Sequence, residues 1–312
     1  MALELFTRTA NYMLVGAVNA IRKDLRAGSK MKEPDYLAAI VTKFPLLMNT
    51  MWGNAKYGGC YIHQRPYVTT KVGNHTCEAG DLLVLCRRKE ENETRINAAL
   101  FQLKMAKRHY RSICPDNQIQ YELYTDWPEF SIGRKYDPAE TYNIEPKTVT
   151  SGAQYLFINV PWGIPADYDD FEYCAEYPPL FTHSIPEPFM SNQRVRSFGR
   201  FLWNFLHWQT GRPIAPNEEL ANDDWSRFIW DLIAKTQNAK ISNINVGIQK
   251  KHGIRRQQGD FFQFMSTDDC ICHLPQDYYN MHENSDEGEP PVEEKIINEG
   301  YDGAISILFI DL

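Results

Sequence analysis

The chain has 312 residues, a formal net charge of -7 and an ordinary composition, with 43% hydrophobic and 23% charged residues. That length can bury one large core or two modest ones, and the 13% aromatic content excludes a wholly disordered chain. The acidic balance argues against non-specific coating of a polyanion, although it leaves room for a local basic cleft.

The N-terminal part predicts helices followed by a strand. Apolar residues at helical spacing predict helices over residues 1–28 and 34–44. Pro45 should break or kink the second helix, because proline lacks the N–H that continues the hydrogen-bond ladder. Aromatic and β-branched residues predict strand over 60–70, and the Gly-Asn pair at 73–74 predicts a turn.

The middle of the chain predicts a hairpin. Residues 81–86 are apolar after the first, which is typical of a strand buried on both faces. Residues 87–95 are mostly charged and predict a loop or a hairpin tip, and 96–104 predict the returning strand. A short helix should begin at residue 118 and end before Pro128.

The C-terminal half mixes irregular and regular segments. It predicts a strand over 155–160, a proline-rich irregular stretch over 161–190, helices over 197–208 and 223–233, and a last strand over 304–310. The order of elements indicates an α/β fold, with a mixed central sheet flanked by helices and a largely helical C-terminal elaboration.

We expect two parts. Residues 1–150 would form the core with its N-terminal helices, and residues 151–312 would complete the fold or act as a recognition or oligomerisation subdomain. The proline-rich stretch near the start of the second part is the expected boundary.

Polar residues stand near the ends of two strands that are otherwise apolar. Asp81 opens the first strand, and Gln102 and Lys104 lie near the end of the second. Because residues two apart on a strand face the same side, Gln102 and Lys104 should project together, while Phe101 and Leu103 pack on the opposite face. If the two strands pair as a hairpin, Asp81 lies at the same end as Gln102.

A carboxylate, an amide oxygen and an ammonium at one strand end suit phosphodiester hydrolysis. Oxygen atoms of Asp81 and Gln102 could bind Mg²⁺ or Mn²⁺, which lowers the pKa of a bound water and neutralises charge on phosphate oxygens. Lys104 would orient the attacking water or stabilise the transition state. Glu78, three residues before Asp81, would add a further carboxylate.

A site for nucleic acid also needs positive charge around it. Lys107, Arg108 and Arg111 follow the second strand closely and are the expected nucleic-acid-binding residues, with Arg87 and Arg88 as further candidates. The ordinary alternative for such a run is a solvated helix face.

The motif resembles a known family. Asp81-Leu-Leu-Val-Leu, followed after a hairpin-length gap by Phe101-Gln102-Leu103-Lys104, resembles the PD-(D/E)XK nuclease superfamily, in the Mrr-type variant that carries Gln in place of the second acid. The segment from Glu78 to Asp81 is similar to the start of this motif in bacterial proteins, many of them tied to defence against phage. The resemblance covers about residues 35–125. It implies a restriction-endonuclease-like core and Mg²⁺-dependent cleavage of nucleic acid, with DNA expected, in antiviral defence.

Two departures from the family pattern keep alternatives open. The superfamily often carries an acid on the helix before the first core strand, and here Glu33 is the nearest candidate, because residues 46–57 hold none. Gln102 also gives a metal site one negative charge fewer than an acid would. The competing function is a catalytically inactive nucleic-acid- or protein-binding subunit of a defence complex, and the third is a structural protein. A homo-oligomer or a defence-complex partner fits the first two.

The cysteines and the apolar segments indicate the compartment. Seven scattered cysteines indicate reduced thiols rather than a secreted disulfide framework. No basic leader precedes the first apolar stretch and no run is long enough to span a bilayer, so we expect a cytoplasmic protein without a membrane partner. Cys270, Cys272, His273 and His282 form a sparse zinc-like set without a second closely spaced pair.

Overall fold

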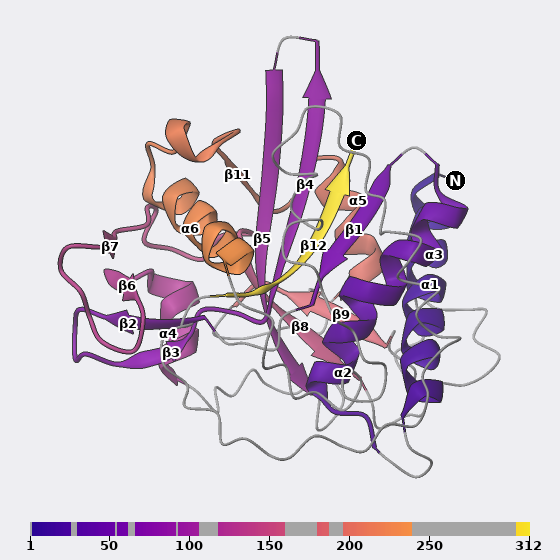
Figure 1. Cartoon of the computed structure of the whole chain (residues 1–312), viewed down its shortest axis with the longest axis horizontal. Helices are drawn as coiled ribbons and strands as arrows, with labels where there is room; N and C mark the ends of the chain where they lie inside the picture. The colour runs from indigo at the N-terminus through magenta and orange to yellow at the C-terminus, as the bar shows by residue number, and fades with distance from the viewer. Residues whose placement is uncertain are drawn as a thin grey trace.

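A computed structural model describes residues 2–25, 30–53, 55–61, 66–91, 93–105, 118–159, 180–186, 196–238 and 304–312. A mixed sheet runs through the middle of the molecule with helices packed against it, and a second, smaller sheet lies beside it (Figure 1). The fold is therefore α/β with a mixed central sheet, as the sequence predicts.

The N-terminal helices are α1 (Ala2–Asp24), α2 (Glu33–Ala38) and α3 (Phe44–Met51). The kink predicted at Pro45 takes the form of a π-helical turn over Ala39–Lys43, in which the N–H of Phe44 donates to the carbonyl five residues back. Because Pro45 has no N–H to continue the α-helical ladder, the turn before it widens, and the chain then continues as α3.

The large sheet has the strand order β1-β12-β4-β5-β8-β9-β10, with β11 also paired to β5. β4 and β5 form an antiparallel hairpin, β12 runs parallel to β4, and β8 runs parallel to β5. Strands from both sides of residue 150 therefore pair in one sheet. The bounds are β1 (Lys56–Cys60), β4 (Leu82–Glu90), β5 (Glu93–Met105), β8 (Ala153–Ile158), β9 (Phe181–Ser184), β10 (Arg196–Ser197), β11 (Arg212–Ile214) and β12 (Ser306–Asp311).

The β4–β5 hairpin is longer than the sequence predicts. The two strands pair from Leu82 opposite Phe101 out to Glu90 opposite Glu93, so most of the segment expected to be a loop is strand. The far ends of both strands project beyond their neighbours (Figure 1). Charged side chains are tolerated there because they reach solvent while the backbone groups stay paired across the hairpin.

The small sheet has the order β3-β2-β6-β7, all antiparallel. Sequence analysis predicts β2 (Tyr67–Thr70) and the following turn at Gly73 and Asn74, both of which adopt positive φ. It misses β3 (Thr76–Glu78), β6 (Phe130–Ile132) and β7 (Thr141–Tyr142), because strands of two or three residues are too short to show an alternating pattern.

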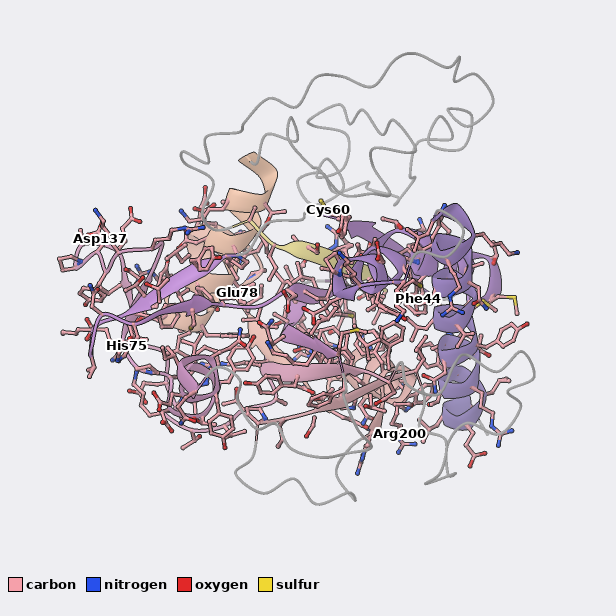
Figure 2. The ribbon with its side chains drawn as sticks, turned by 90° about the horizontal axis from the view of Figure 1, so that it is seen from below. Phe44, Cys60, His75, Glu78, Asp137 and Arg200 are labelled. Atoms are coloured by element: carbon pink, nitrogen blue, oxygen red, sulfur yellow. The ribbon has the colours of Figure 1, made fainter. Side chains whose placement is uncertain are left out.

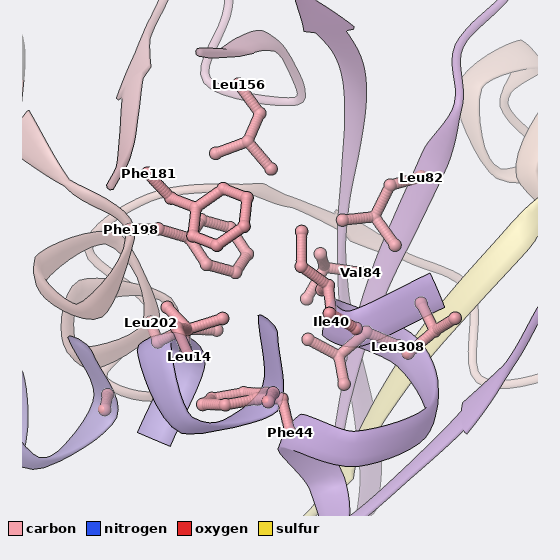
Figure 3. Close-up of a cluster of buried hydrophobic side chains, with 14 of the residues drawn as sticks. Leu14, Ile40, Phe44, Leu82, Val84, Leu156, Phe181, Phe198, Leu202 and Leu308 are labelled. Carbon is pink, nitrogen blue, oxygen red and sulfur yellow. The ribbon is translucent and has the colours of Figure 1, made fainter. Parts of the chain in front are cut away.

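The core is divided by the sheet into two apolar clusters. Along β5, Phe101 and Leu103 belong to the cluster under α1, α2, α3 and α5 (Phe198–Leu206), part of which Figure 3 shows. Leu100 and Ala98 belong to the opposite cluster, under α4 (Gln118–Asp126) and α6 (Asp224–Asn238). The alternation predicted for the end of β5 is confirmed, and it turns the even-numbered residues toward α4.

The C-terminal half contributes both helices and strands. Ser197 caps α5 by accepting a hydrogen bond from Arg200 N (3.2 Å), and Asp223 caps α6 by accepting from Ser226 N (3.0 Å). The described residues after 150 also supply β8 to β12, so a largely helical C-terminal part is not confirmed. Within the described ranges, no helix is long and apolar enough to cross a membrane.

Candidate active site

The register of the hairpin brings Asp81 opposite Gln102. Leu82 pairs with Phe101, and the N–H of Asp81 donates to the carbonyl of Phe101 (2.8 Å). The side-chain nitrogen of Gln102 donates to Oδ2 of Asp81, and the backbone N–H of Leu103 donates to the same oxygen (2.8 Å). The prediction that these two polar residues meet at a shared strand end is confirmed.

A close backbone approach just before Asp81 makes this contact possible. A Cβ at Gly80 would lie 2.8 Å from Cδ1 of Leu100 and 3.1 Å from the carbonyl of Phe101, so a larger residue here would push against β5. Glu78 ends β3 just before this turn. Figure 2 shows Glu78 where the small sheet joins the rest of the molecule, with His75 and Asp137 toward its outer end.

Gln120 on α4 extends the hydrogen bonds into a chain. Its nitrogen donates to the backbone carbonyl of Glu78 (2.9 Å) and to the side-chain oxygen of Gln102. Because a carbonyl only accepts, this contact determines the orientation of both amides, and Gln102 turns its nitrogen toward Asp81. Gln102 and Gln120 are 1% and 2% exposed, so their amides depend on these partners.

Aromatic packing holds α4 where Gln120 can reach the hairpin. The hydroxyl of Tyr124 donates to the carbonyl of Ala79 (2.7 Å), and the rings of Trp127 and Tyr155 lie 6.0 and 5.7 Å from the Tyr124 ring. Sequence reasoning missed Gln120. The available signal is a glutamine four residues before buried Tyr124, on the apolar face of the helix.

Lys104 lies on the same strand face as Gln102, two residues further along β5. It pairs with Phe157 of β8, and its side chain is partly exposed. Its positive charge lowers the pKa of Asp81, so its ammonium group acts on the carboxylate. Of the four residues predicted for the site, Asp81 and Gln102 are in direct contact, and Lys104 lies on the strand face of Gln102. Glu78 is linked to them through Gln120, which donates to its backbone carbonyl.

Acids outnumber cations around Asp81. Burial first, and then the negative charges of Glu33 and Glu78, raise the pKa of Asp81 to about 8, while the N–H of Leu103 and the charge of Lys104 lower it. Near neutral pH this carboxyl group therefore keeps its proton unless a cation neutralises the group. Like charges brought together in this way are typical of ligand sites rather than of structural ion pairs.

Glu33 is the acidic residue on α2 that the sequence analysis named as the nearest candidate for the helix before the first core strand. It is the first residue of α2, and α2 packs against β5. Its neighbour Asp35 accepts a hydrogen bond from the N–H of Lys32 (2.7 Å) and so caps the helix. The charge of Glu33 acts instead on Asp81. The acid that the sequence offered on this helix therefore raises the pKa of Asp81.

Asp81, Glu33 and Glu78 are the residues that could hold a hard divalent cation. Asp81, Glu33 and Glu78 offer carboxylate oxygens, and their excess negative charge matches Mg²⁺ better than a neutral ligand. In the part of the chain that the structure describes, no three His, Cys, Asp or Glu side chains already meet as a metal-binding group. The oxygen of Gln102 is engaged by Gln120, so Gln102 would have to turn its amide over to serve as a ligand.

Comparisons with known proteins add no family. No protein-family model, no curated protein and no solved structure matches the chain. The chemistry of the site therefore has to be interpreted from its own residues.

The two arginines of β4 that were expected to surround the site with positive charge lie elsewhere. Arg87 is buried and forms a two-point ion pair with Asp311, from Nε to Oδ1 and from Nη2 to Oδ2, both at 2.9 Å. Arg88 donates to the carbonyl of Leu206 (2.9 Å). Both lie six or seven residues along β4 from Asp81, about 20 Å away at strand spacing. Their proposed role as rim residues of this site is wrong.

Other candidates lie outside the described residues. They are the nucleic-acid-binding residues Lys107, Arg108 and Arg111 and the zinc-like set Cys270, Cys272, His273 and His282. Their roles stay predictions.

Proposed function

We propose that this protein is a metal-dependent nuclease of the PD-(D/E)XK type that hydrolyses phosphodiester bonds of DNA. The observation that carries the proposal is the contact of the buried Asp81 carboxyl group with Gln102, two residues before Lys104 on β5, and the pKa of Asp81, raised to about 8 by burial and by Glu33 and Glu78, supports it. Negative charges near a buried carboxyl group do not stabilise the fold, because ionisation of the buried group costs free energy unless a cation is present. A site for a divalent cation and a polyanionic substrate benefits from that arrangement.

Glu33 supports the family assignment within this proposal. The superfamily pattern asks for an acid on the helix before the first core strand, and Glu33 begins α2, which precedes β1. Asp81 comes directly before β4, and Gln102 and Lys104 lie in β5. The bacterial defence setting rests on the resemblance alone.

In the proposed reaction, Asp81 and Glu33 would hold Mg²⁺ or Mn²⁺, with Glu78 reaching the ion directly or through water. The ion, when bound, supplies a water of lowered pKa and neutralises charge on phosphate oxygens. Among the described residues, the side-chain amide of Gln102 and the backbone N–H of Leu103 both donate to Oδ2 of Asp81, so Oδ1 is the oxygen that would bind the ion.

Lys104 and Gln102 have different proposed roles. Lys104 would interact with the reacting groups, whereas Gln102 orients Asp81. The ammonium of Lys104 would stabilise negative charge that develops on the phosphorus oxygens, or orient the attacking water. Gln102, held by Gln120, donates to Asp81 and fixes its orientation. Gln102 is thus proposed as a positioning residue, and its use as a direct metal ligand requires release from Gln120.

One observation favours a second candidate function. The oxygen of Gln102 is already bonded to Gln120, so the site offers one ligand fewer than a site with an acid at this position. A catalytically inactive, nucleic-acid-binding subunit of a defence complex would show this arrangement. Such a protein would bind DNA through the same face without cleaving it.

Degradation of plasmid DNA with and without Mg²⁺ separates the two functions. Wild type should cleave in Mg²⁺, and Lys104→Ala and Asp81→Ala should each lose on the order of 100-fold or more, as expected for groups that stabilise transition-state charge. Lys56→Ala is the matched control, because Lys56 is an exposed lysine at the end of another strand of the same sheet.

Three outcomes are decisive. Cleavage by wild type with loss in both variants supports the nuclease. Equal activity in wild type and both variants rules out the site. Absence of cleavage with retained DNA binding favours the inactive subunit.

A further inference from the structure

An aromatic side chain lies beside Lys104 on the neighbouring strand. In the parallel pairing of β5 with β8, Tyr155 is the partner of Gln102, and Phe157 is the partner of Lys104. Because partners on neighbouring strands extend to the same face of a sheet, both rings share the face on which Gln102 and Lys104 stand. Neighbouring strands are about 5 Å apart, so the backbones of Phe157 and Lys104 are adjacent.

The rings on this face form a row that leads out of the core. The rings of Tyr124 and Tyr155 lie 5.7 Å apart, and the rings of Tyr155 and Phe157 lie 6.2 Å apart with 21° between their planes. Tyr124 and Tyr155 are 0% and 2% exposed, whereas Phe157 is partly exposed. The row therefore begins under α4 and ends at a ring that solvent reaches.

Packing alone explains Phe157 poorly. Every other residue of β8 is buried, so Phe157 is the exception on its strand. An apolar ring that serves only the core stabilises the fold most when it is fully buried. Tyr155 covers one side of the Phe157 ring, and among the described residues no second ring packs against it. The exposed part of this ring lies instead next to the positive charge of the proposed site.

Phe157 lies within reach of a nucleotide whose phosphate is held at Asp81. Asp81 contacts Gln102 across the hairpin, and Phe157 lies one strand beyond β5 and two residues further along. At strand spacing, with about 3.3 Å per residue, the backbones of Asp81 and Phe157 are about 12 Å apart. A base is joined to its phosphate through the sugar, so a nucleotide that adjoins the cleaved phosphate can extend its base past Lys104 to this ring.

We propose that Phe157 stacks on an unpaired base of the nucleic-acid substrate, next to the phosphate that is cleaved. This proposal rests on the nuclease function proposed above and specifies the form of its substrate. A base can lie against a protein ring only when its own face is free, either in a single strand or after the base has turned out of a duplex. Stacking of this kind tolerates any sequence, because every base has a π face. The base would extend the row of rings, while Lys104 interacts with the phosphate.

Binding of single strands with and without bases tests the proposal in the absence of cleavage. The measurement is fluorescence anisotropy with the full chain carrying Asp81→Asn, in chelator. The probes are two labelled DNA single strands of equal length, one of mixed sequence and one made of abasic sites. Adding Phe157→Ala should weaken binding of the mixed-sequence strand about 10-fold and leave binding of the abasic strand unchanged. The slope of log K against log salt should stay the same, because no charge is removed.

Three further variants separate the aromatic ring from its packing. Phe157→Leu keeps an apolar side chain against Tyr155 but has no π face, so it should weaken binding of the mixed-sequence strand nearly as much as Phe157→Ala. Phe157→Trp keeps a ring and should retain the affinity. Tyr12→Ala is the matched control, because it removes a 64% exposed ring from α1, on the opposite side of the sheet, and it should leave the binding of both strands unchanged.

A labelled duplex identifies the source of the unpaired base. If Phe157→Ala weakens binding of the duplex as well as of the mixed-sequence strand, the base is one that has turned out of the duplex. If only the single strand is weakened, a single strand is the form that the site takes.

Failure of this proposal is distinguishable from failure of the nuclease function. If wild type does not cleave but Phe157→Ala weakens only the strand that carries bases, the nuclease function fails and the base contact stands. If wild type cleaves and Phe157→Ala changes neither binding nor KM, the base contact is overturned and the nuclease stands. Equal losses on the mixed-sequence and abasic strands, or binding of neither strand by the Asp81→Asn chain, would overturn the base contact as well.

Discussion

The two ends of the β4–β5 hairpin carry buried polar groups in opposite electrostatic surroundings. At the far end, Arg87 and Asp311 neutralise each other and tie β4 to β12. At the near end, burial and the negative charges of Glu33 and Glu78 raise the pKa of Asp81 to about 8. The same hairpin therefore holds one carboxylate with its counter-ion and another among like charges.

This difference in charge distinguishes the structural end of the hairpin from the proposed functional end. Buried groups that complete each other's charge and hydrogen bonds stabilise the fold once formed, although removal of one partner is costly. A buried acid whose charge is not compensated lowers stability, and we interpret such an acid as part of a ligand site, because a bound ligand would compensate it. The far end is thus interpreted as a structural link, and the near end as the site.

The largest expected effect is at the far end. Arg87→Leu leaves the partly buried Asp311 carboxylate without its partner and should lower the free energy of unfolding by about 3 kcal/mol. The double variant with Asp311→Leu should lose less than the sum of the two single variants. Denaturant unfolding of the four proteins measures both quantities. A loss below about 1 kcal/mol in Arg87→Leu would mean that the pair does not hold this end together.

Replacement of Asp by Asn should change the free energy of unfolding in opposite directions at the two ends. In chelator at pH 7, Asp81→Asn should raise the free energy of unfolding by about 2 kcal/mol, because it removes a carboxyl group that is costly to ionise in the folded state. Asp311→Asn, the matched control, should lower it, because Arg87 loses its counter-ion. Destabilisation by both variants would contradict the contrast between the two ends.

The pH dependence of the first variant follows from the raised pKa. With a pKa of about 8 in the folded state against an ordinary 3.8, folded Asp81 holds a proton that the unfolded chain releases. Wild type should therefore lose stability relative to Asp81→Asn as the pH rises from about 4 to about 8, with no difference at lower pH. Denaturant unfolding in chelator across this range measures the difference, and a difference independent of pH would argue against a raised pKa.

The amide chain at the near end should contribute less than the ion pair. Gln120→Leu removes the donor to Gln102 and to the carbonyl of Glu78 and should cost about 1–3 kcal/mol, since both acceptors remain buried. Gln118→Leu, at an exposed position of the same helix, is the control and should stay within about 0.5 kcal/mol. Thermal or denaturant unfolding distinguishes them, and equal losses would show that Gln120 has no special role.

The smallest effect is expected near the hairpin tip. Arg95 is 51% exposed in its side chain and lies 5.9 Å from the ring centroid of Trp208. Arg95→Ala should therefore cost only about 0.5–1 kcal/mol in denaturant unfolding. A loss as large as that of Arg87→Leu would mean that charge alone, and not burial, decides which end is structural.

Sequence reasoning reached the near end of the hairpin and failed at the far end. Asp81, Gln102 and Lys104 stood out because polar residues interrupt apolar strands, and strand periodicity then predicts their shared face. Arg87 looked like part of a charged loop, because its partner Asp311 lies 224 positions away and leaves no local pattern. Gln120 was missed for the same reason: its role depends on how α4 packs across the sheet.

The positions of helices and strands were easier to predict from the sequence than the pairing of strands in the sheet. The long helices and the hairpin strands carry enough residues to show their period, whereas β12 was found without any sign that it inserts between β1 and β4. Glu33 could be named as the nearest acid, yet only packing of α2 against β5 brings its charge to Asp81.

The near end of the hairpin is proposed to bind a divalent cation through Asp81. Denaturant unfolding of wild type and Asp81→Asn over a series of Mg²⁺ concentrations tests it without relying on activity. Wild type should gain stability in proportion to the logarithm of Mg²⁺ once binding is saturated, and Asp81→Asn should not. If Mg²⁺ stabilises both proteins equally, or neither, the acids around Asp81 are not a metal site and the account is wrong.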